Sequence, residues 1–144
     1  MTLYEALDRV DALKPNAFSK AEKIAWISQL EGRVKTEILD AHEGAERPFR
    51  GYTDETDGNT RLFAEGPFAE LYVYYVSAMI DHYDRETAAY NNSMKLFNAL
   101  YAEYLAFYNR RHRPKTGRFR FFTPTKEEVE QGGAALPFPR ENKN

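Results

Sequence analysis

The chain has 144 residues, of which 42% are apolar and 29% charged, so it is long enough for one globular domain with a substantial core. Its 10 Tyr, 10 Phe and single Trp exclude a fully disordered chain, and the absence of cysteine excludes disulfides, thiolate metal sites and cysteine nucleophiles. No apolar run reaches the roughly 18 residues of a membrane-spanning helix, and the first residues lack the regions of a secretory signal, which favours synthesis in the cytoplasm and no membrane partner.

Charge is distributed unevenly along the chain. Residues 1–109 carry 11 basic and 18 acidic side chains, a net charge of −7, whereas residues 110–144 carry 9 basic and 4 acidic ones, a net charge of +5. This asymmetry predicts a helical body over 1–109 and an extended interaction arm over 110–144.

Two helices are predicted in the first third of the chain. Thr2 begins a Thr-x-x-Glu capping box for a helix over 2–13, and Ser19 begins a Ser-x-x-Glu box for a longer helix over 19–43. The longer helix has an apolar stripe at helical spacing, formed by Ile24, Ile27, Leu30, Val34 and Ile38. Residues 43–66 have no periodicity and contain Gly and Pro, so a long loop is expected there, a feature that is often functional.

The third predicted helix, over 67–83, is apolar around about 200° of its circumference, twice the arc of an ordinary surface helix. We therefore expect it to be central and buried, with Val73, Val76 and Ile80 in the core and a second stripe turned toward another subunit. The candidates for subunit contacts are Phe68, Tyr72, Tyr75 and Met79, together with Leu96, Leu100 and Phe107 of the next helix.

The fourth predicted helix, over 84–109, has a heptad-like apolar seam. The seam comprises Tyr90, Met94, Phe97, Tyr101, Tyr104 and Tyr108. The predicted fold is therefore all-α, with about four helices, of which two are long and one is central, a long loop over 43–66 and a basic C-terminal arm.

The arm combines basic and aromatic side chains, which suits an acidic protein surface because arginine pairs with carboxylates in bidentate geometry and aromatic rings fill pockets. The candidate contact residues are Arg110, Arg111, Arg113, Lys115, Arg118, Phe119, Arg120, Phe121 and Phe122. The same residue types neutralise phosphates and stack on bases, so a DNA-binding accessory protein is the alternative interpretation.

Motifs for catalysis, metal binding or cofactor binding are absent from the sequence. None of the three histidines has a Glu three residues before it or a second His four residues away, and the nucleophile-elbow, Walker A and dinucleotide motifs are missing. We interpret His42 as a cation favoured by the end of the second helix, and Asp81, His82 and Asp84 as a solvated polar turn. The sequence thus predicts no enzyme, no cofactor and no metal.

Several segments, taken in order, resemble a known family. They are Leu13-Lys14-Pro15-Asn16, Ile24-Ala25-Trp26-Ile27, Leu71-Tyr72-Val73-Tyr74-Tyr75, Tyr90-Asn91-Asn92-Ser93 and Tyr108-Asn109-Arg110. Together they resemble the small all-helical head–tail connector proteins (adaptor or head completion proteins) of long-tailed bacteriophages, over about residues 3–113.

The resemblance implies a non-catalytic virion protein of the head–tail neck. Such proteins form a ring, typically a dodecamer, that docks on the portal protein, extends the channel for genomic DNA without reading its sequence, and receives a stopper or tail-completion protein. We accordingly expect the arm to reach the portal and the acidic loop to face the channel. The channel-facing candidates are Glu46, Asp54, Glu55 and Asp57.

Overall fold

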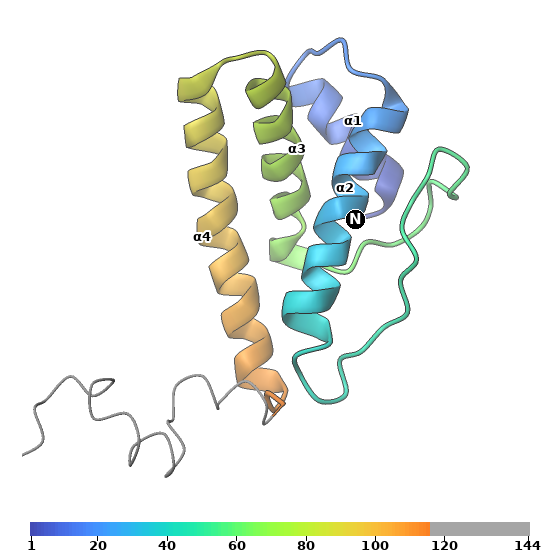
Figure 1. The fold of residues 1–144 in the computed structure, drawn as a ribbon, viewed down its shortest axis with the longest axis vertical. Coiled ribbons are helices and arrows are strands. Elements are labelled where there is room, and N and C mark those ends of the chain that lie inside the picture. The colour runs from blue at the N-terminus through green and yellow to red at the C-terminus, as the bar shows by residue number, and fades with distance from the viewer. Residues whose placement is uncertain (116–144) are drawn as a thin grey trace, which may run out of the picture. The chain divides into compact units, whose positions relative to one another are not determined.

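The computed structural model describes residues 1–115, and its compact body spans Met1–Arg113 (Figure 1). Its α-helices are α1 (Leu3–Leu13), α2 (Lys20–Val34), α3 (Glu70–Tyr83) and α4 (Thr87–Arg111). A π-helical turn, η1 (Lys35–Leu39), extends α2, and a 3-10 turn, η2 (Gly66–Phe68), precedes α3. Residues 1–115 contain no β-strand beyond isolated bridges, so the predicted all-α fold is confirmed.

The first two helices begin as their sequences predict. The Thr2 hydroxyl accepts a hydrogen bond from the Glu5 amide at 3.2 Å, and the Glu5 carboxylate accepts one from the Thr2 amide at 2.8 Å, which completes the capping box. The Ser19 hydroxyl likewise accepts from the Glu22 amide at 3.2 Å. Each cap satisfies a backbone N–H that has no partner within its helix.

Three predicted helix boundaries are wrong by three or four residues. The third helix begins at Glu70 rather than residue 67, because a separate 3-10 turn occupies Gly66–Phe68. The second helix ends at Leu39 rather than near residue 43, because the wider π turn closes with a hydrogen bond from the Asp40 amide to the Lys35 carbonyl at 2.8 Å. The fourth helix begins at Thr87 rather than residue 84, because the chain reverses through a tight turn in which Arg85 has a positive φ of 61°. A non-glycine residue in that conformation interrupts helical geometry.

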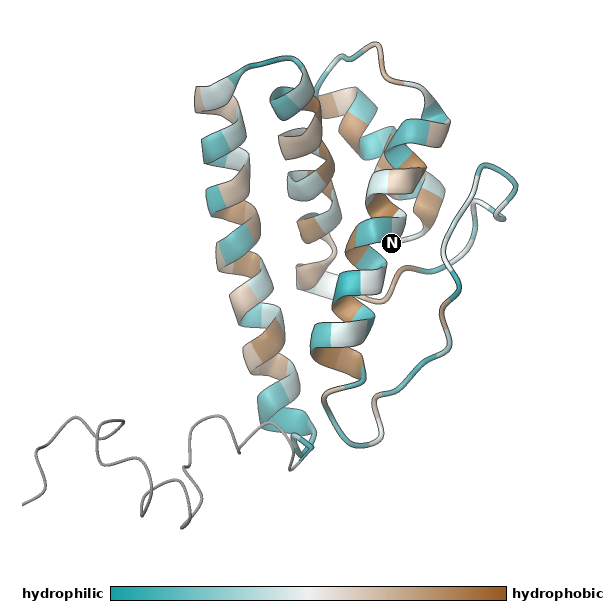
Figure 2. Cartoon of the chain, in the orientation of Figure 1, coloured by the Kyte–Doolittle hydropathy of each residue, from teal (hydrophilic) through white to brown (hydrophobic). Residues whose placement is uncertain are grey.

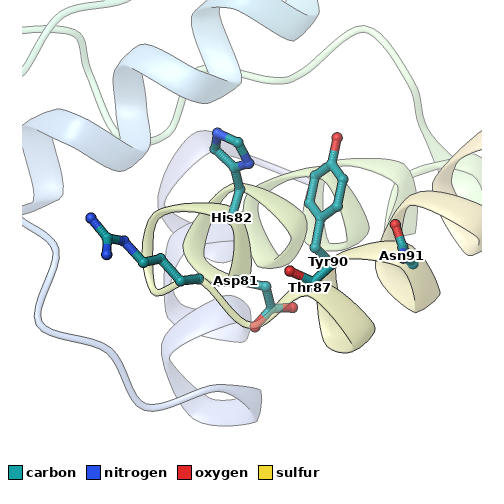
Figure 3. A pocket seen from close by; sticks show the side chains of 6 residues that line it. Asp81, His82, Thr87, Tyr90 and Asn91 are labelled. Atoms are coloured by element: carbon teal, nitrogen blue, oxygen red, sulfur yellow. The ribbon is translucent and has the colours of Figure 1, made fainter.

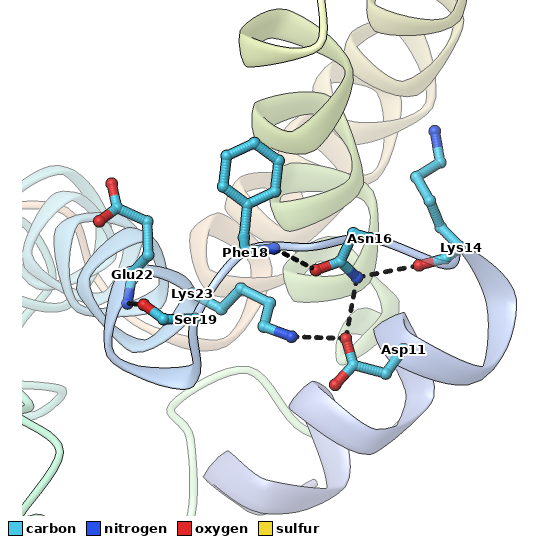
Figure 4. Close-up of polar contacts among 7 residues, drawn as sticks. All are labelled: Asp11, Lys14, Asn16, Phe18, Ser19, Glu22 and Lys23. Atoms are coloured by element: carbon cyan, nitrogen blue, oxygen red, sulfur yellow. Dashed lines mark hydrogen bonds and ion pairs between the residues drawn. The ribbon is translucent and has the colours of Figure 1, made fainter.

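A small polar network fixes the connection between α1 and α2 (Figure 4). The Asn16 side chain donates to the Asp11 carboxylate at 2.9 Å and to the Lys14 carbonyl at 3.0 Å, and its oxygen accepts from the Phe18 amide at 3.2 Å. Lys23, only 5% exposed, pairs with the same Asp11 carboxylate at 2.6 Å. The turn therefore orients α2 across α1 by directional hydrogen bonds rather than by apolar contact alone.

The third helix occupies the centre of the body, as predicted. α3 packs against α1, α2 and α4, and its contact with α4 is the most extensive in the fold. Val73, Val76 and Ile80 are all buried. Figure 2 agrees with this position, since α3 is largely brown or pale whereas α4 alternates between teal and brown along its length.

The second apolar stripe of α3 meets α4 of the same chain, which corrects one sequence-based interpretation. Tyr72 was expected at a subunit contact, but it is fully buried in the body's own core. The Tyr75 ring lies 5.4 Å from the Phe97 ring, and the Phe68 ring lies 5.2 Å from the Tyr104 ring. The wide apolar arc of α3 is thus covered largely by the aromatic seam of α4, and Tyr72 cannot serve a neighbouring subunit.

The long connection between η1 and η2 has no regular structure but is tied down at both ends of its path. Near the N-terminus, the Leu3 amide donates to the Thr60 carbonyl at 2.9 Å and the Leu62 amide donates to the Met1 carbonyl at 3.1 Å. Earlier in the loop, the Tyr52 amide donates a hydrogen bond to the Ser28 hydroxyl of α2 at 2.9 Å. Because these contacts anchor the loop to the helices, the segment that leads into η2 has a fixed position.

A candidate partner-binding surface

Glu31 of α2 is a fully buried carboxylate that joins three parts of the fold. It accepts hydrogen bonds from the Tyr72 hydroxyl of α3, from the Tyr52 hydroxyl at 3.0 Å and from the Phe63 amide at 3.1 Å. The Tyr72 hydroxyl in turn accepts from the Ala64 amide at 2.9 Å. The loop is therefore held to α2 and α3 at residues 63 and 64, immediately before η2.

Burial and hydrogen bonding oppose each other at this carboxylate. Burial raises the pKa of the Glu31 carboxyl above its ordinary value, although the hydrogen bonds from Tyr72, Phe63 and Tyr52 and the charge of Arg47 oppose the rise. Burial, followed by the neighbouring Glu31 charge, also raises the pKa of Tyr72 well above its usual range. The pKa of Tyr52 is raised in the same way, so the Tyr52 and Tyr72 hydroxyls both remain protonated and can donate to Glu31 at any physiological pH.

The C-terminal end of α4 is fixed to the turn that follows η1. The buried His42 ring places Nδ1 at 2.6 Å from the Ile38 carbonyl and Nε2 at 2.7 Å from the Asn109 side-chain oxygen. The Glu43 amide donates to the Arg113 carbonyl at 2.8 Å. His42 is thus a buried bridge between two elements, and the sequence-based interpretation of it as a cation at a helix end misses this role.

The loop segment held by Glu31 and the end of α4 held by His42 enclose an aromatic groove of about 510 Å³. It lies between the segment around η2 and the last turns of α4, and we call it the α4 groove. Its lining residues are Arg47, Phe63, Glu65, Pro67, Phe68, Tyr104, Phe107, Tyr108 and Arg111. A volume of this size falls within the range of about 300–1,000 Å³ typical of binding sites.

Tyr104 lines this groove and carries a buried hydroxyl. The residue is 2% exposed, and its buried hydroxyl has no hydrogen-bond partner within residues 1–115. The Tyr108 ring meets it edge-on with 5.2 Å between centroids. Burial, and secondarily Tyr108, raises the pKa of Tyr104, so its hydroxyl is a neutral donor.

The rim of the α4 groove is mostly basic. Arg47 and Arg111 are exposed, and the Arg111 guanidinium stacks 4.5 Å above the centre of the Phe107 ring. Glu65 is the acidic residue of the rim, and Arg61 lies 3.7 Å from its carboxylate, which partly neutralises it. The arrangement offers an apolar floor beside two cations, which suits an occupant that is apolar and negatively charged.

A second, smaller cavity of about 200 Å³ lies at the turn between α3 and α4 (Figure 3). Figure 3 shows the His82 and Tyr90 rings projecting on one side, with 5.4 Å between their centroids, and Asp81 pointing elsewhere. Asp81 is buried and forms an ion pair with Lys14, and its other oxygen accepts from Ser93 at 3.4 Å. The interpretation of Asp81 as part of a solvated turn is therefore wrong, and its role is structural.

The residues predicted to contact a partner divide between the helix end and the chain beyond it. Arg110 and Arg111 lie exposed in the last turn of α4 rather than in an arm, and Arg113 and Lys115 follow directly and are exposed. The remaining candidates lie outside the described residues: Arg118, Phe119, Arg120, Phe121 and Phe122.

The other candidate residues differ in exposure. Leu96 is 53% exposed on α4. Partly buried positions are occupied by Phe68, Tyr75, Met79, Leu100 and Phe107, of which Phe68 and Phe107 line the α4 groove. The acidic loop residues Glu46, Asp54, Glu55 and Asp57 are all exposed. Apart from Tyr72, these positions are compatible with contacts to other molecules.

Within residues 1–115, no three His, Cys, Asp or Glu side chains gather in a way that could hold a metal ion. The helices of this part of the chain are too short or too polar to cross a membrane. No protein-family model, no curated protein and no solved structure matches the chain.

The two most informative polar residues were missed at the level of sequence. Glu31 follows Ile27 by four residues and precedes Val34 by three, so it lies on the apolar stripe of α2, and an acid on such a stripe was an available signal of a buried carboxylate. The unpaired Tyr104 hydroxyl had no such signal, because Tyr104 is one of several tyrosines in a regular seam. Only the packing of the loop against α4 distinguishes it.

Proposed function

We propose that this chain is a structural subunit of the head–tail neck of a long-tailed bacteriophage. In this role it forms an adaptor ring, typically a dodecamer, that docks on the portal protein, extends the DNA channel and receives a stopper or tail-completion protein. The proposal assigns no catalysis and no cofactor to the chain. The observation that carries it is the resemblance to the connector family of several sequence segments, taken in their order along the chain over about residues 3–113. This range closely matches the compact body of Met1–Arg113.

The geometry of the body is consistent with a docking role. Arg110, Arg111 and Arg113 lie together at the end of α4, which is held in place through His42. Because their backbone is anchored, these exposed arginines can meet a carboxylate-rich surface without any further ordering of the helix end. In a ring, the same modest contact is repeated in every subunit, so the assembly gains avidity without a tight individual interface.

The proposed ring also assigns roles to the remaining surface. The acidic loop residues Glu46, Asp54, Glu55 and Asp57 would face the channel, where repulsion of phosphates lets DNA slide rather than adhere. Leu96 on the outer side of α4 would contact the neighbouring subunit, since an exposed leucine gains apolar burial there.

The direct test mixes the full-length protein with the portal protein of the same genome. Size-exclusion chromatography with light scattering is expected to give a complex whose mass fits a closed ring of this chain on the portal ring, and electron microscopy is expected to show a continuous central channel. Deletion of residues 114–144 should leave the helical body folded by circular dichroism but abolish the complex. Absence of any complex with the full-length chain contradicts the proposal.

The alternative, a DNA-binding accessory protein, is distinguished by its salt dependence. Electrostatic DNA binding loses affinity steeply as salt increases, because bound cations are released from the phosphates. If the chain is a connector subunit, a gel-shift titration with duplex DNA at two salt concentrations is expected to show only weak binding by the isolated subunit. Tight binding that is abolished by substitution of Arg110, Arg111 and Arg113 would favour the alternative.

A further inference from the structure

We propose that the α4 groove binds an acidic peptide segment that carries one bulky apolar side chain, presented by the protein on which the ring assembles. The inference rests on the proposed function and deepens it, since it identifies where the partner is held and which chemistry is recognised. In this arrangement the apolar side chain lies on the aromatic floor, the peptide backbone meets Tyr104, and an adjacent carboxylate meets Arg47 and Arg111.

The first argument is the shape and lining of the groove. Four aromatic rings, those of Phe63, Phe68, Phe107 and Tyr108, share a cavity of about 510 Å³ that is open to solvent. The Phe68 and Phe107 rings are in contact, with 5.1 Å between centroids. A hollow lined by aromatic rings on anchored segments is the usual setting for an inserted apolar side chain, because binding then orders few groups of the receptor.

The second argument is the Tyr104 hydroxyl. A buried hydroxyl without a partner is unfavourable, and such groups are rare in folded proteins. Within residues 1–115 nothing satisfies it, although Tyr104 lines the groove. The hydroxyl has almost no accessible surface, so a peptide carbonyl accepts its proton only if the Tyr104 ring turns toward the groove on binding, and the hydroxyl then becomes a specific donor in the complex.

The third argument is charge, which favours an acidic occupant over the two obvious alternatives. Arg47 and Arg111 border the groove, and Arg61 offsets the charge of Glu65. The chain's own segment 118–122 contains two arginines and would meet like charge at this rim. A nucleic acid would bring a continuous row of phosphates, whereas the lining of this groove offers two arginines beside the Glu65 carboxylate, which suits a short segment with few charges.

The test uses the full-length protein and a blocked, isotopically unlabelled hexapeptide that has one phenylalanine among acidic residues. In heteronuclear NMR titrations, the peptide is expected to shift the aromatic signals of Phe68, Tyr104 and Phe107 and the guanidinium signals of Arg47 and Arg111. Two matched peptides, one with alanine in place of phenylalanine and one with lysines in place of the acids, should bind at least tenfold more weakly.

Two variants connect this binding to the groove. Tyr104→Phe removes only the hydroxyl and should weaken the peptide about five- to tenfold, the value of one hydrogen bond. Arg47→Gln combined with Arg111→Gln should weaken it at least as much and remove its salt dependence. Arg50→Gln, an exposed arginine of the same loop that does not line the groove, is the matched control and should leave affinity unchanged.

The outcomes separate this inference from the proposed function. Any one of four results would overturn the groove assignment. In the first two, the acidic peptide fails to bind at 2 mM, or its binding shifts NMR signals outside the groove. In the other two, the lysine peptide binds equally well, or a single-stranded oligonucleotide binds more strongly. In the portal-mixing experiment, a ring that assembles normally with both Tyr104→Phe and the double arginine variant overturns the groove assignment and leaves the proposed function standing. Failure of the unsubstituted chain to assemble overturns the proposed function itself.

Discussion

The Glu31 carboxylate of α2 accepts a hydrogen bond from the Tyr72 hydroxyl of α3, and both residues are fully buried. The same two residues hold the backbone amides of Phe63 and Ala64, so one polar pair connects two helices with the long loop. The loop then enters η2 and the α4 groove. A change at Glu31 should therefore affect both stability and the shape of the groove.

Glu31→Ala should destabilise the fold by about 3 kcal/mol or more, because it leaves two phenolic hydroxyls and one amide without their buried acceptor. Glu31→Gln retains one acceptor oxygen and should cost about half as much. Urea unfolding at neutral pH measures both values. Glu103→Ala, at an exposed position on α4, is the control and should lie within about 0.5 kcal/mol of the unsubstituted protein. Equal effects of the alanine and glutamine variants at position 31 would contradict the hydrogen-bonding role.

The raised pKa of Glu31 predicts the pH dependence of its contribution to stability. A carboxyl whose pKa is higher in the folded state than in the unfolded chain contributes fully below its unfolded value, which is about 4.5, and the contribution is lost as pH rises through the folded value. The free energy of unfolding of the unsubstituted protein, relative to Glu31→Gln, should therefore decrease between pH 4 and pH 7. A difference that stays constant across this range would show that the carboxyl has an ordinary pKa.

Tyr104→Phe and Tyr72→Phe should have opposite effects on stability. The Tyr104 hydroxyl is buried without a partner among the described residues, so its removal should be neutral or stabilise the fold by up to about 1 kcal/mol. The Tyr72 hydroxyl donates to Glu31 and accepts from Ala64, so its removal should destabilise the fold by about 2 kcal/mol. Thermal unfolding of the two variants provides the comparison. A destabilised Tyr104→Phe would indicate that the hydroxyl is satisfied in solution.

Gly58→Ala should loosen the loop at its contact with α1. A Cβ atom at residue 58 would lie 2.1 Å from Cδ2 and 2.2 Å from Cγ of the Tyr4 ring, so the ring or the backbone must move. Such overpacking costs about 1–3 kcal/mol. Hydrogen exchange should show faster exchange of the Leu3 and Leu62 amides, which pair the loop with the N-terminus. Tyr4→Ala removes the obstacle, so Gly58→Ala in that background should have little effect.

Ile80→Asp and Leu96→Asp should separate the core from the surface. Ile80 is 1% exposed, and an unpaired charge at its position should cost several kcal/mol and abolish soluble expression. Leu96 is 53% exposed, so the same substitution there should leave the folded chain intact while weakening assembly of the proposed ring. Circular dichroism and light scattering distinguish the two effects. A Leu96→Asp protein that still forms rings would remove this residue from the subunit interface.

The sequence by itself determined the helical fold and most of its register. Capping at Thr2 and Ser19 is local, since a side chain bonds a backbone amide three residues away, and the apolar spacing of α3 and α4 depends only on helical periodicity. These short-range features predicted the four helices and the burial of Val73, Val76 and Ile80 correctly. They failed at Leu39, Glu70 and Thr87, where a π turn, a 3-10 turn and a residue with positive φ set the boundaries.

The tertiary structure alone decided which surfaces the chain covers for itself. Periodicity shows that α3 has two apolar faces but not whether α4 or another subunit covers the second, and the observed packing buries Tyr72 within the chain. The α4 groove depends on residues more than 60 positions apart, Arg47 and Arg111 among them, which line the same groove because Glu31 and His42 fix the loop and the end of α4. Local sequence patterns cannot predict such sites, because the geometry of the site arises from long-range hydrogen bonds between side chains and backbone.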